Sequence, residues 1–235
     1  MKKKILAIIP AKQFSKGLKN KNMITLAGKP LIDWTIDRAI QSKLISKIVL
    51  SSDSSKIISH VKKKYKNSID IPFKRAKKLS TFSSPIYKTI LHAINFYKKQ
   101  NINYDLIVLL EPTSPIRFKN DIDKAIKTFL KVIQKYDTLI SVGKMKYSPL
   151  FSKKIIGNNL LNFYKTKKKN LNRQNFESLF FPFGVIYISK VKSFEQKKTF
   201  YVDKKMTFYK IKDNQCFEID DVIDLKIVKT ILKEI

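Results

Sequence analysis

The sequence predicts an α/β fold, in which a mostly parallel sheet carries helices on both faces and holds an inserted β-arm. Three observations predict it. Short apolar runs alternate with longer segments of helical period, which is typical of a parallel sheet covered by helices. The first run, KILAIIP, is apolar enough for a buried strand. The alternation stops between residues 145 and 205, where the chain is aromatic and basic, and we interpret this segment as the arm of a single domain spanning 1–235.

The elements follow from apolar period and punctuation, taken in chain order. Strands are predicted at 4–10, 47–53, 69–75, 104–110 and 138–143, and helices between them at 30–43, 55–65, 84–100 and 120–136. In the third helix, one face collects Ile86, Ile90, Leu91, Ile94 and Tyr97. After the arm begins, FPFGVIYISK (181–190) and MTFYKIK (206–212) indicate strands, and 221–235 indicates a closing helix.

Topology predicts where a ligand binds. In an open α/β sheet, the site lies where loops leave the carboxyl ends of the strands. The loops concerned are 11–22, 52–54, 74–84 and 111–119, with 213–220 nearby.

The charge is extreme, with a formal net value of +31. Alone, it would suggest a polyanion such as nucleic acid or an anionic membrane. However, the 49 basic residues include only four arginines, namely Arg38, Arg75, Arg117 and Arg173. The many lysines, accompanied by Ile and Asn, are equally typical of an A/T-biased genome. We therefore favour a solvated lysine surface over nucleic-acid binding.

Cysteine usage and hydropathy indicate the compartment. The single cysteine, Cys216, allows no internal disulfide and fits a reducing environment. MKKKILAIIPA resembles a signal peptide, but its apolar run is only about seven residues and fits a buried strand better. No run approaches the roughly 20 apolar residues of a membrane span, so we expect a cytoplasmic protein.

The first loop, AKQFSKGLKNKN, is rich in lysine and poor in acid. Ser15, Gly17 and successive backbone N–H groups could converge on an anion beside Lys12, Lys16, Lys19 and Lys21. It matches neither the Walker pattern nor the dinucleotide-binding glycine pattern. From composition alone, a phosphate site and a solvated loop are both open.

A family resemblance resolves this choice. IIPAKQFSKGLKNKN (8–22) followed by LAGKPLIDWTID (26–37) resembles the nucleotide-binding opening of the acylneuraminate cytidylyltransferases. Further similar motifs follow in order: LSSDS (50–54), LLEPTSPIRFKNDID (109–123), NRQNFE (172–177), FPFGVIYI (181–188) and FEIDDVIDL (217–225). Because they cover nearly the whole chain, it is identified as a member of this family.

The resemblance implies a Rossmann-like nucleotidyltransferase sheet whose 145–205 arm mediates homodimerisation and reaches over the partner's site. It implies transfer of CMP from CTP to the anomeric hydroxyl of a 2-keto-3-deoxy sugar acid, with release of pyrophosphate. It also implies Mg²⁺, or Mn²⁺, as cofactor. The rivals are a nucleotidyltransferase acting on a sugar phosphate and, less favoured, a non-enzymatic nucleic-acid-binding protein.

Residue roles carry over by motif position. The implied catalytic residues are Lys16, Lys21, Arg173 and Asp220, and the implied nucleotide-binding residues are Ala11, Lys12, Ser15, Gly17, Asn22, Arg75 and Ser80. The sugar-binding candidates are Glu111, Arg117 and Tyr187. Glu218 and Asp220 are the implied metal ligands, since Mg²⁺ prefers oxygen ligands and i, i+2 side chains of a strand share a face. The alternative is that Asp220 only caps the last helix.

Arginine usage supports part of this assignment. Three of the four arginines, Arg75, Arg117 and Arg173, fall in matched motifs, and lysine cannot replace a planar fork that binds an anion bidentately. Chance with ordinary ion pairs is the alternative.

Five positions depart from the family pattern. Lys12 replaces Arg, and Glu111 replaces Gln. Phe82 replaces Asp, while Phe181 and Phe183 replace Arg and Asn near the acceptor. These departures leave the identity of the sugar acid open.

Overall fold

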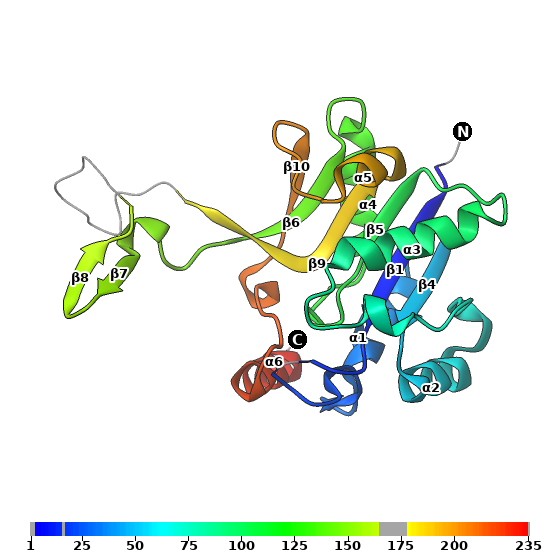
Figure 1. Ribbon diagram of the computed structural model, residues 1–235, viewed down its shortest axis with the longest axis horizontal. Helices are drawn as coiled ribbons and strands as arrows, with labels where there is room; N and C mark the ends of the chain where they lie inside the picture. The colour runs from blue at the N-terminus through cyan, green and yellow to red at the C-terminus, as the bar shows by residue number, and fades with distance from the viewer. Residues whose placement is uncertain (1–2, 16, 165–177, 235) are drawn as a thin grey trace.

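The computed structural model describes residues 3–15, 17–164 and 178–234 (Figure 1). Its centre is a six-stranded sheet with the strand order β10-β6-β9-β5-β1-β4. The strands are β1 (Ile5–Ala11), β4 (Lys47–Ser52), β5 (Leu106–Leu109), β6 (Thr138–Lys144), β9 (Phe180–Lys190) and β10 (Met206–Lys210). β1 runs parallel to β4 and β5, and β10 runs parallel to β6, whereas β9 is antiparallel to both of its neighbours. The predicted mostly parallel sheet is confirmed.

Helices cover both faces of the sheet, as predicted (Figure 1). On one face lie α1 (Leu31–Ile40), α2 (Ser55–Tyr65) and α4 (Asp121–Val132), and on the other lie α3 (Ile86–Lys98) and α5 (Val191–Lys197). Successive residues of β1 face alternate sides, so that Ile5 packs with the first group and Leu6 with the second. Two-sided burial explains why β1 is a continuous apolar run.

A third cluster of apolar residues lies beside the sheet and packs against the last helix. α6 (Val222–Glu234) buries Val228 against Leu18 of the first loop and Ile219 of the segment that precedes the helix. A two-stranded ribbon, β2 (Thr25–Leu26) with β3 (Lys29–Pro30), contributes Leu26 to the same cluster. The first loop and the C-terminal acids are therefore neighbours, although about 200 residues separate them in the sequence.

Short 3-10 helices complete the regular structure at Lys21–Met23, Lys66–Ser68, Lys77–Leu79, Pro149–Phe151 and Asp213–Gln215. No helix in the described ranges has the length and apolarity that crossing a membrane requires.

The prediction of a strand at 69–75 is wrong. Only a single parallel bridge forms there, between Asp70 and Val49. Pro72 has no N–H to donate to a ladder, and Arg75 N donates to the carbonyl of Ser52, the last residue of β4, at 2.8 Å.

The 145–205 segment is divided between two parts of the molecule. Its strand 181–190 lies inside the main sheet as β9, between β5 and β6, and 191–197 forms α5, which the sequence did not indicate. The projecting part carries a hairpin of β7 (Lys153–Ile156) and β8 (Asn159–Asn162) (Figure 1). The arm is thus shorter than the boundaries drawn from the sequence.

Candidate active site

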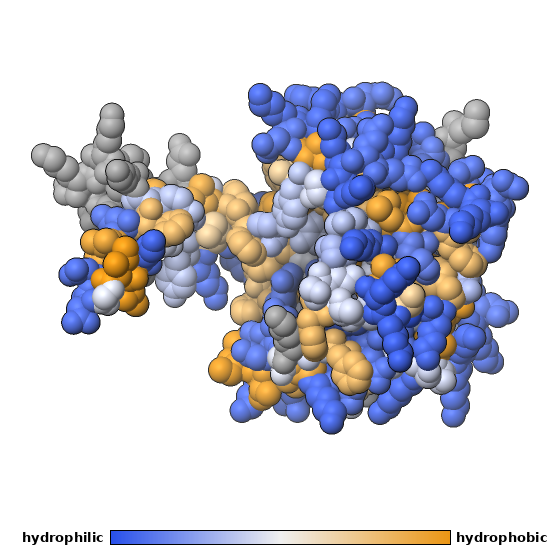
Figure 2. Space-filling model, viewed as in Figure 1, coloured by the Kyte–Doolittle hydropathy of each residue, from blue (hydrophilic) through white to orange (hydrophobic). Residues whose placement is uncertain are grey.

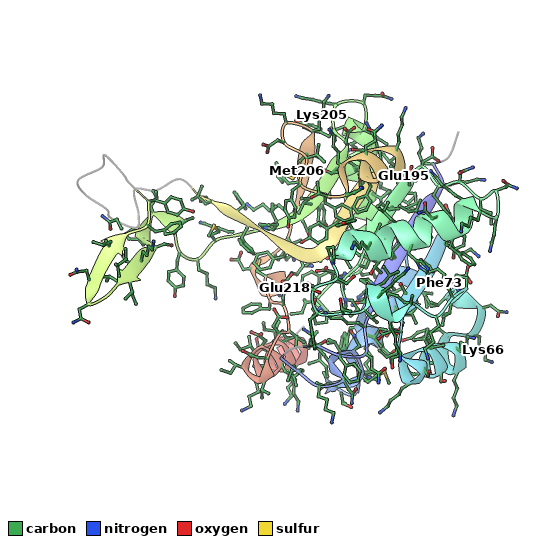
Figure 3. All side chains as sticks on the ribbon, viewed as in Figure 1. Lys66, Phe73, Glu195, Lys205, Met206 and Glu218 are labelled. Carbon is green, nitrogen blue, oxygen red and sulfur yellow. The ribbon has the colours of Figure 1, made fainter. Side chains whose placement is uncertain are left out.

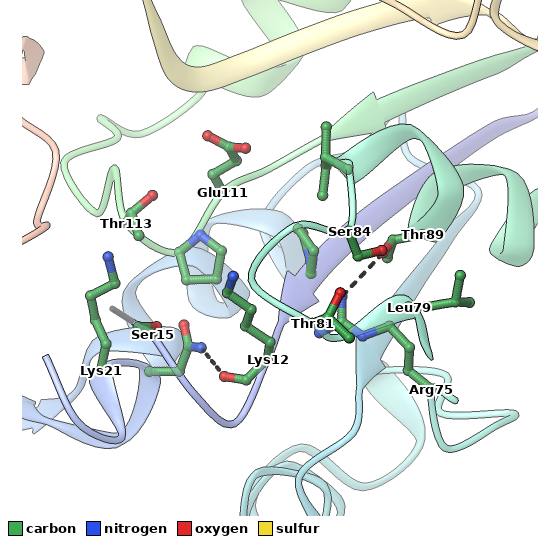
Figure 4. A pocket seen from close by; sticks show the side chains of 14 residues that line it. Lys12, Ser15, Lys21, Arg75, Leu79, Thr81, Ser84, Thr89, Glu111 and Thr113 are labelled. Carbon is green, nitrogen blue, oxygen red and sulfur yellow. Dashed lines mark hydrogen bonds between the residues drawn. The ribbon is translucent and has the colours of Figure 1, made fainter. Parts of the chain in front are cut away.

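A cavity of about 210 Å³ opens at the carboxyl ends of β1 and β5 (Figure 4). It lies at the edge of the sheet that topology predicts. Six residues proposed from the sequence line it together: Lys12, Ser15, Lys21, Asn22, Arg75 and Glu111. The remaining lining residues are Pro10, Leu79, Thr81, Ser84, Ile86, Thr89, Pro112 and Thr113.

One hydrogen bond within the first loop and one from the end of β4 hold this loop at the cavity. Asn22, which is buried, donates from its Nδ2 to the carbonyl of Lys12 at 3.0 Å. The backbone N–H of Gln13 donates to Asp53 Oδ1 at 2.9 Å. Ala11, the last residue of β1, is fully buried and contributes backbone only. The loop conformation is therefore fixed by tertiary contacts.

Lys21 is a buried cation that joins the loop to the C-terminal acids. It is 6% exposed, and its Nζ donates to the carbonyl of Ile219 at 2.7 Å and to Asp220 Oδ1 at 2.9 Å. An ammonium group has three donors, so one remains for the cavity that Lys21 lines.

Arg75 carries the strongest indication of a ligand. It is 4% exposed and donates from NH1 to Thr89 Oγ1 at 3.2 Å. Its buried Nε and NH2 have no hydrogen-bond partner among the described residues, and Asp53 Oδ1 lies 3.7 Å from NH2. Burial lowers the pKa of Arg75 from its usual value, and the Asp53 charge opposes this shift. Unpaired buried donors cost free energy, so this wall is built for an acceptor-rich ligand.

Two carboxylates lie close together at the cavity, Glu111 in its wall and Glu218 beside it. Glu218, labelled in Figure 3, accepts hydrogen bonds from the backbone N–H of Gly184 and, at 3.1 Å, from Ser114 Oγ. Burial raises the pKa of Glu111 to about 7, and the neighbouring charge of Glu218 adds to the shift. A cation placed here would relieve this repulsion.

The acids provide a pair of candidate ligands on one segment. Glu218 and Asp220 flank the fully buried Ile219, although 216–220 is irregular and not a strand. The described residues hold no group of three or more His, Cys, Asp or Glu side chains placed for a metal. A two-carboxylate site of this kind suits Mg²⁺, which completes its shell with phosphate oxygens and water.

The predicted sugar contact of Arg117 disagrees with the structure. Arg117 is 2% exposed, and its guanidinium donates to the carbonyls of Val185 (2.7 Å), Glu111 (2.8 Å) and Gly184 (3.2 Å) and to Thr35 Oγ1 (2.8 Å). Burial lowers its pKa to about 9. Because its guanidinium N–H groups donate mainly to backbone carbonyls, Arg117 supports β9, the strand that carries Gly184, and does not face a substrate.

Three further candidates lie outside the cavity wall. Ser80 donates weakly to the carbonyl of Ala76 at 3.5 Å, while its neighbours Leu79 and Thr81 line the cavity in its place. Gly17 stands against the backbone of Asp220.

Tyr187 packs its ring 5.2 Å from that of Phe200, and burial, reinforced by Glu111, raises its pKa above the usual value. Lys16 and Arg173 lie outside the described residues, so their roles stay predictions.

Residues that the sequence did not single out also shape the site. Thr113 and Ser114 belong to the PTSP motif after β5, and Thr89 lies one helical turn from Ile86 in α3. The position of Thr113 and Ser114 in the motif at 109–123 is the signal that could have found them. The ring of Phe82, a departure from the family pattern, lies 5.5 Å from the ammonium of Lys12, which is another departure.

Comparisons with known proteins relate the chain to cytidylyltransferases. The family model described as "Cytidylyltransferase" matches residues 6–230. The chain is 30% identical to the CMP-N,N'-diacetyllegionaminic acid synthase of Legionella pneumophila, covering 98% of this chain and 97% of that protein. It is 29% identical to the N-acylneuraminate cytidylyltransferase of Escherichia coli over 98% of its own length, but spans only 52% of that relative.

Among solved structures, a CMP:2-keto-3-deoxy-manno-octonic acid synthetase complexed with CTP superposes with a TM-score of 0.68 at 13% identity, covering 98% of this chain and 99% of that one. At this identity the likeness concerns the fold. The match of the family model over nearly the whole chain, together with the full-length Legionella relative, shows that the chain belongs to the cytidylyltransferase family.

Proposed function

We propose that the chain transfers CMP from CTP to the anomeric hydroxyl of a 2-keto-3-deoxy sugar acid of the sialic-acid-like class, releasing pyrophosphate. The observation that carries the proposal is the buried Arg75, whose Nε and NH2 lack hydrogen-bond partners among the described residues in a cavity that Lys12 and Lys21 also line. A nucleoside triphosphate offers both an acceptor-rich base and ribose and a compact polyanion. The names of the relatives, which act on sialic and legionaminic acids, support the acceptor class.

The nucleotide would lie along the first loop. Lys12 and Lys21 act as point charges for the phosphate oxygens, while Asn22 keeps the loop backbone in place. Arg75 would bind ribose or base with its unpaired donors, helped by Thr81 and Ser84. Lys16 and Ser15 would also bind the triphosphate.

The reaction is a displacement at the α-phosphorus. The anomeric oxygen forms a bond to that phosphorus as the bond to the β-phosphate oxygen breaks, and the hydroxyl proton is released to water. Charge develops on the phosphate oxygens, so fixed cations accelerate the step. Glu218 and Asp220 would hold Mg²⁺ or Mn²⁺, which when bound neutralises phosphate charge and lowers the pKa of the attacking hydroxyl.

The acceptor would lie toward Glu111 and Tyr187. Two carboxylates, Glu111 and Glu218, already meet there, so the carboxylate of a sugar acid needs a cation of its own. We assign this role to Arg173, as the motif position indicates.

The projecting hairpin supports a homodimer. Its apolar side chains are exposed, with Ile155 at 76% and Leu160 at 66% (Figure 2). A two-stranded hairpin is at best marginally stable alone, so we propose that the arm packs on a second copy and reaches over its site. Use of cellular CTP, together with the single thiol of Cys216, favours a cytoplasmic location.

Pyrophosphate release tests the function. The four nucleoside triphosphates are offered with Mg²⁺ and a panel of eight- and nine-carbon keto-deoxy sugar acids. Release that requires both CTP and one acid supports the proposal and identifies the acceptor.

CTP binding without turnover on any acid would contradict the acceptor, and sugar phosphates would then be offered. Absence of nucleotide binding, together with a steep salt-dependent affinity for nucleic acid, would contradict the enzyme assignment altogether.

A further inference from the structure

The glycines of this chain fall into two groups. Only five occur in 235 residues, about 2%, compared with roughly 7% in average proteins. Gly28 and Gly157 have positive φ angles of 87° and 56°, which explains glycine at those turns. Gly17, Gly143 and Gly184 lie outside that region, so space and not backbone freedom explains them.

All three of these glycines stand against the same stretch, Cys216–Asp220, which we call the acid segment. A Cβ on Gly17 would lie 2.0 Å from the carbonyl oxygen of Asp220, and one on Gly143 would lie 2.1 Å from Cys216 Sγ. On Gly184 it would lie 2.9 Å from Glu218 Oε1 and 2.2 Å from Glu111 Oε2. Non-bonded heavy atoms pack at about 3.5–4 Å, so an added methyl group would have to displace the backbone of Asp220 at Gly17, the Cys216 thiol at Gly143, and the Glu111 and Glu218 carboxylates at Gly184.

The three glycines come from separate parts of the fold. Gly17 lies in the first loop, Gly143 in β6 and Gly184 in β9. The acid segment crosses all three, and the hydrogen bond from Ile219 N to the carbonyl of Thr113 (2.8 Å) holds it between them.

We propose that Gly17, Gly143 and Gly184 are positioning residues that set the depth at which the acid segment presents Glu218 and Asp220 to the nucleotide cavity. The metal role of those carboxylates rests on the proposed function, but the packing of the acid segment against the three glycines does not. A methyl group at Gly17 would displace the backbone of the acid segment at Asp220, and a methyl group at Gly143 or Gly184 would displace the thiol of Cys216 or the carboxylate of Glu218.

A size-swap experiment at Gly143 tests the proposal. Gly143→Ala places a methyl group where Cys216 Sγ lies, and Cys216→Ala removes that sulfur. The single Gly143→Ala variant should bind Mn²⁺ at least tenfold more weakly in the presence of a non-hydrolysable CTP analogue, as counted by electron paramagnetic resonance. Cys216→Ala should stay within twofold of wild type. The double variant should regain most of the lost affinity, although the ring of Phe183, 3.0 Å from the added carbon, must shift slightly.

Thermal unfolding without metal provides the second readout. The unfolding midpoint should fall in Gly143→Ala and recover in the double variant. If Gly143→Ala is not expressed in soluble form but the double variant is, this counts as the same rescue. Gly28→Ala is the matched control, because a Cβ there meets nothing within 4 Å. It should lower the midpoint through backbone strain and leave Mn²⁺ affinity unchanged.

Two results would overturn the proposal. Normal Mn²⁺ binding by Gly143→Ala would show that the space at the glycines does not position the carboxylates of the acid segment. A double variant as impaired as Gly143→Ala in both readouts would show that the Cys216 contact is not the cause. If wild type binds no Mn²⁺ with the analogue, the metal assignment of the proposed function fails, and the unfolding data alone decide whether the glycines set the position of the acid segment.

Discussion

Replacing Glu111 by Gln should make the folded protein more stable above pH 7 while changing its stability little below pH 5. Burial, with the charge of Glu218, raises the pKa of Glu111 from 4.5 to about 7. Between these values the folded state holds a proton that the unfolded state has released. Stability therefore falls as pH rises through this window and stays lost above it. Gln cannot ionise, so the variant should lack this loss.

The magnitude follows from the two pKa values. They differ by about 2.5 pH units, and each unit corresponds to about 1.4 kcal/mol, so the loss is about 3 kcal/mol. For a chain of this length, 1 kcal/mol shifts the melting temperature by about 2–4 °C. We therefore expect Glu111→Gln to melt about 6–12 °C above wild type at pH 8, with the difference vanishing toward pH 4.5.

The assay is thermal or urea unfolding of both proteins from pH 4.5 to 8, with divalent metals chelated. Ionisation changes that are common to both proteins cancel in the difference. Asp203→Asn, at an exposed carboxylate, is the control and should run parallel to wild type. Parallel curves for Glu111→Gln and wild type would refute the reasoning, because they would mean that Glu111 is not held in a site that disfavours its charge.

Three further outcomes test the site. Arg75→Lys should raise the KM for CTP at least about tenfold with the fold intact, because a point charge cannot replace an unpaired fork; unchanged kinetics would remove the argument from arginine scarcity. Asp220→Ala and Lys16→Ala should each lower turnover at least about a hundredfold in pyrophosphate release, and near-normal rates would remove those assignments. Arg117→Lys should destabilise the protein by about 1–3 kcal/mol in urea unfolding, because the three donors of an ammonium group leave at least one of the four acceptors of Arg117 unpaired; a loss confined to sugar affinity would restore Arg117 to the acceptor site.

The order of strands and helices could be read from local periodicity. β1 is a continuous apolar run because both of its faces are buried, and the apolar residues of α3 follow the 3.6 period because only one of its faces is buried. The location of the cavity followed as well, since the carboxyl ends of parallel strands meet at one edge. Six proposed residues therefore converge there, including Lys12 and Arg75.

The antiparallel placement of β9 could not be read, because an apolar strand pattern specifies a face but neither a partner nor a direction. The hydrogen-bond partners of each arginine could not be predicted from the sequence either. Arg75 and Arg117 lie in similar motifs, yet one keeps unpaired donors in a cavity and the other uses its fork on backbone carbonyls.

Sequence alone therefore determined the fold class, the ligand-binding edge of the sheet and the chemical character of the first loop, because these depend on local pattern and topology. Only the tertiary structure decided which charges meet. Glu111 and Glu218 are more than 100 residues apart in the sequence and lie together at one partly buried site, and the carbonyl of Asp220 occupies the space that a side chain on Gly17 would need. Such pairings depend on distances across the folded chain, where burial strengthens electrostatic interactions and close packing leaves no room for a methyl group.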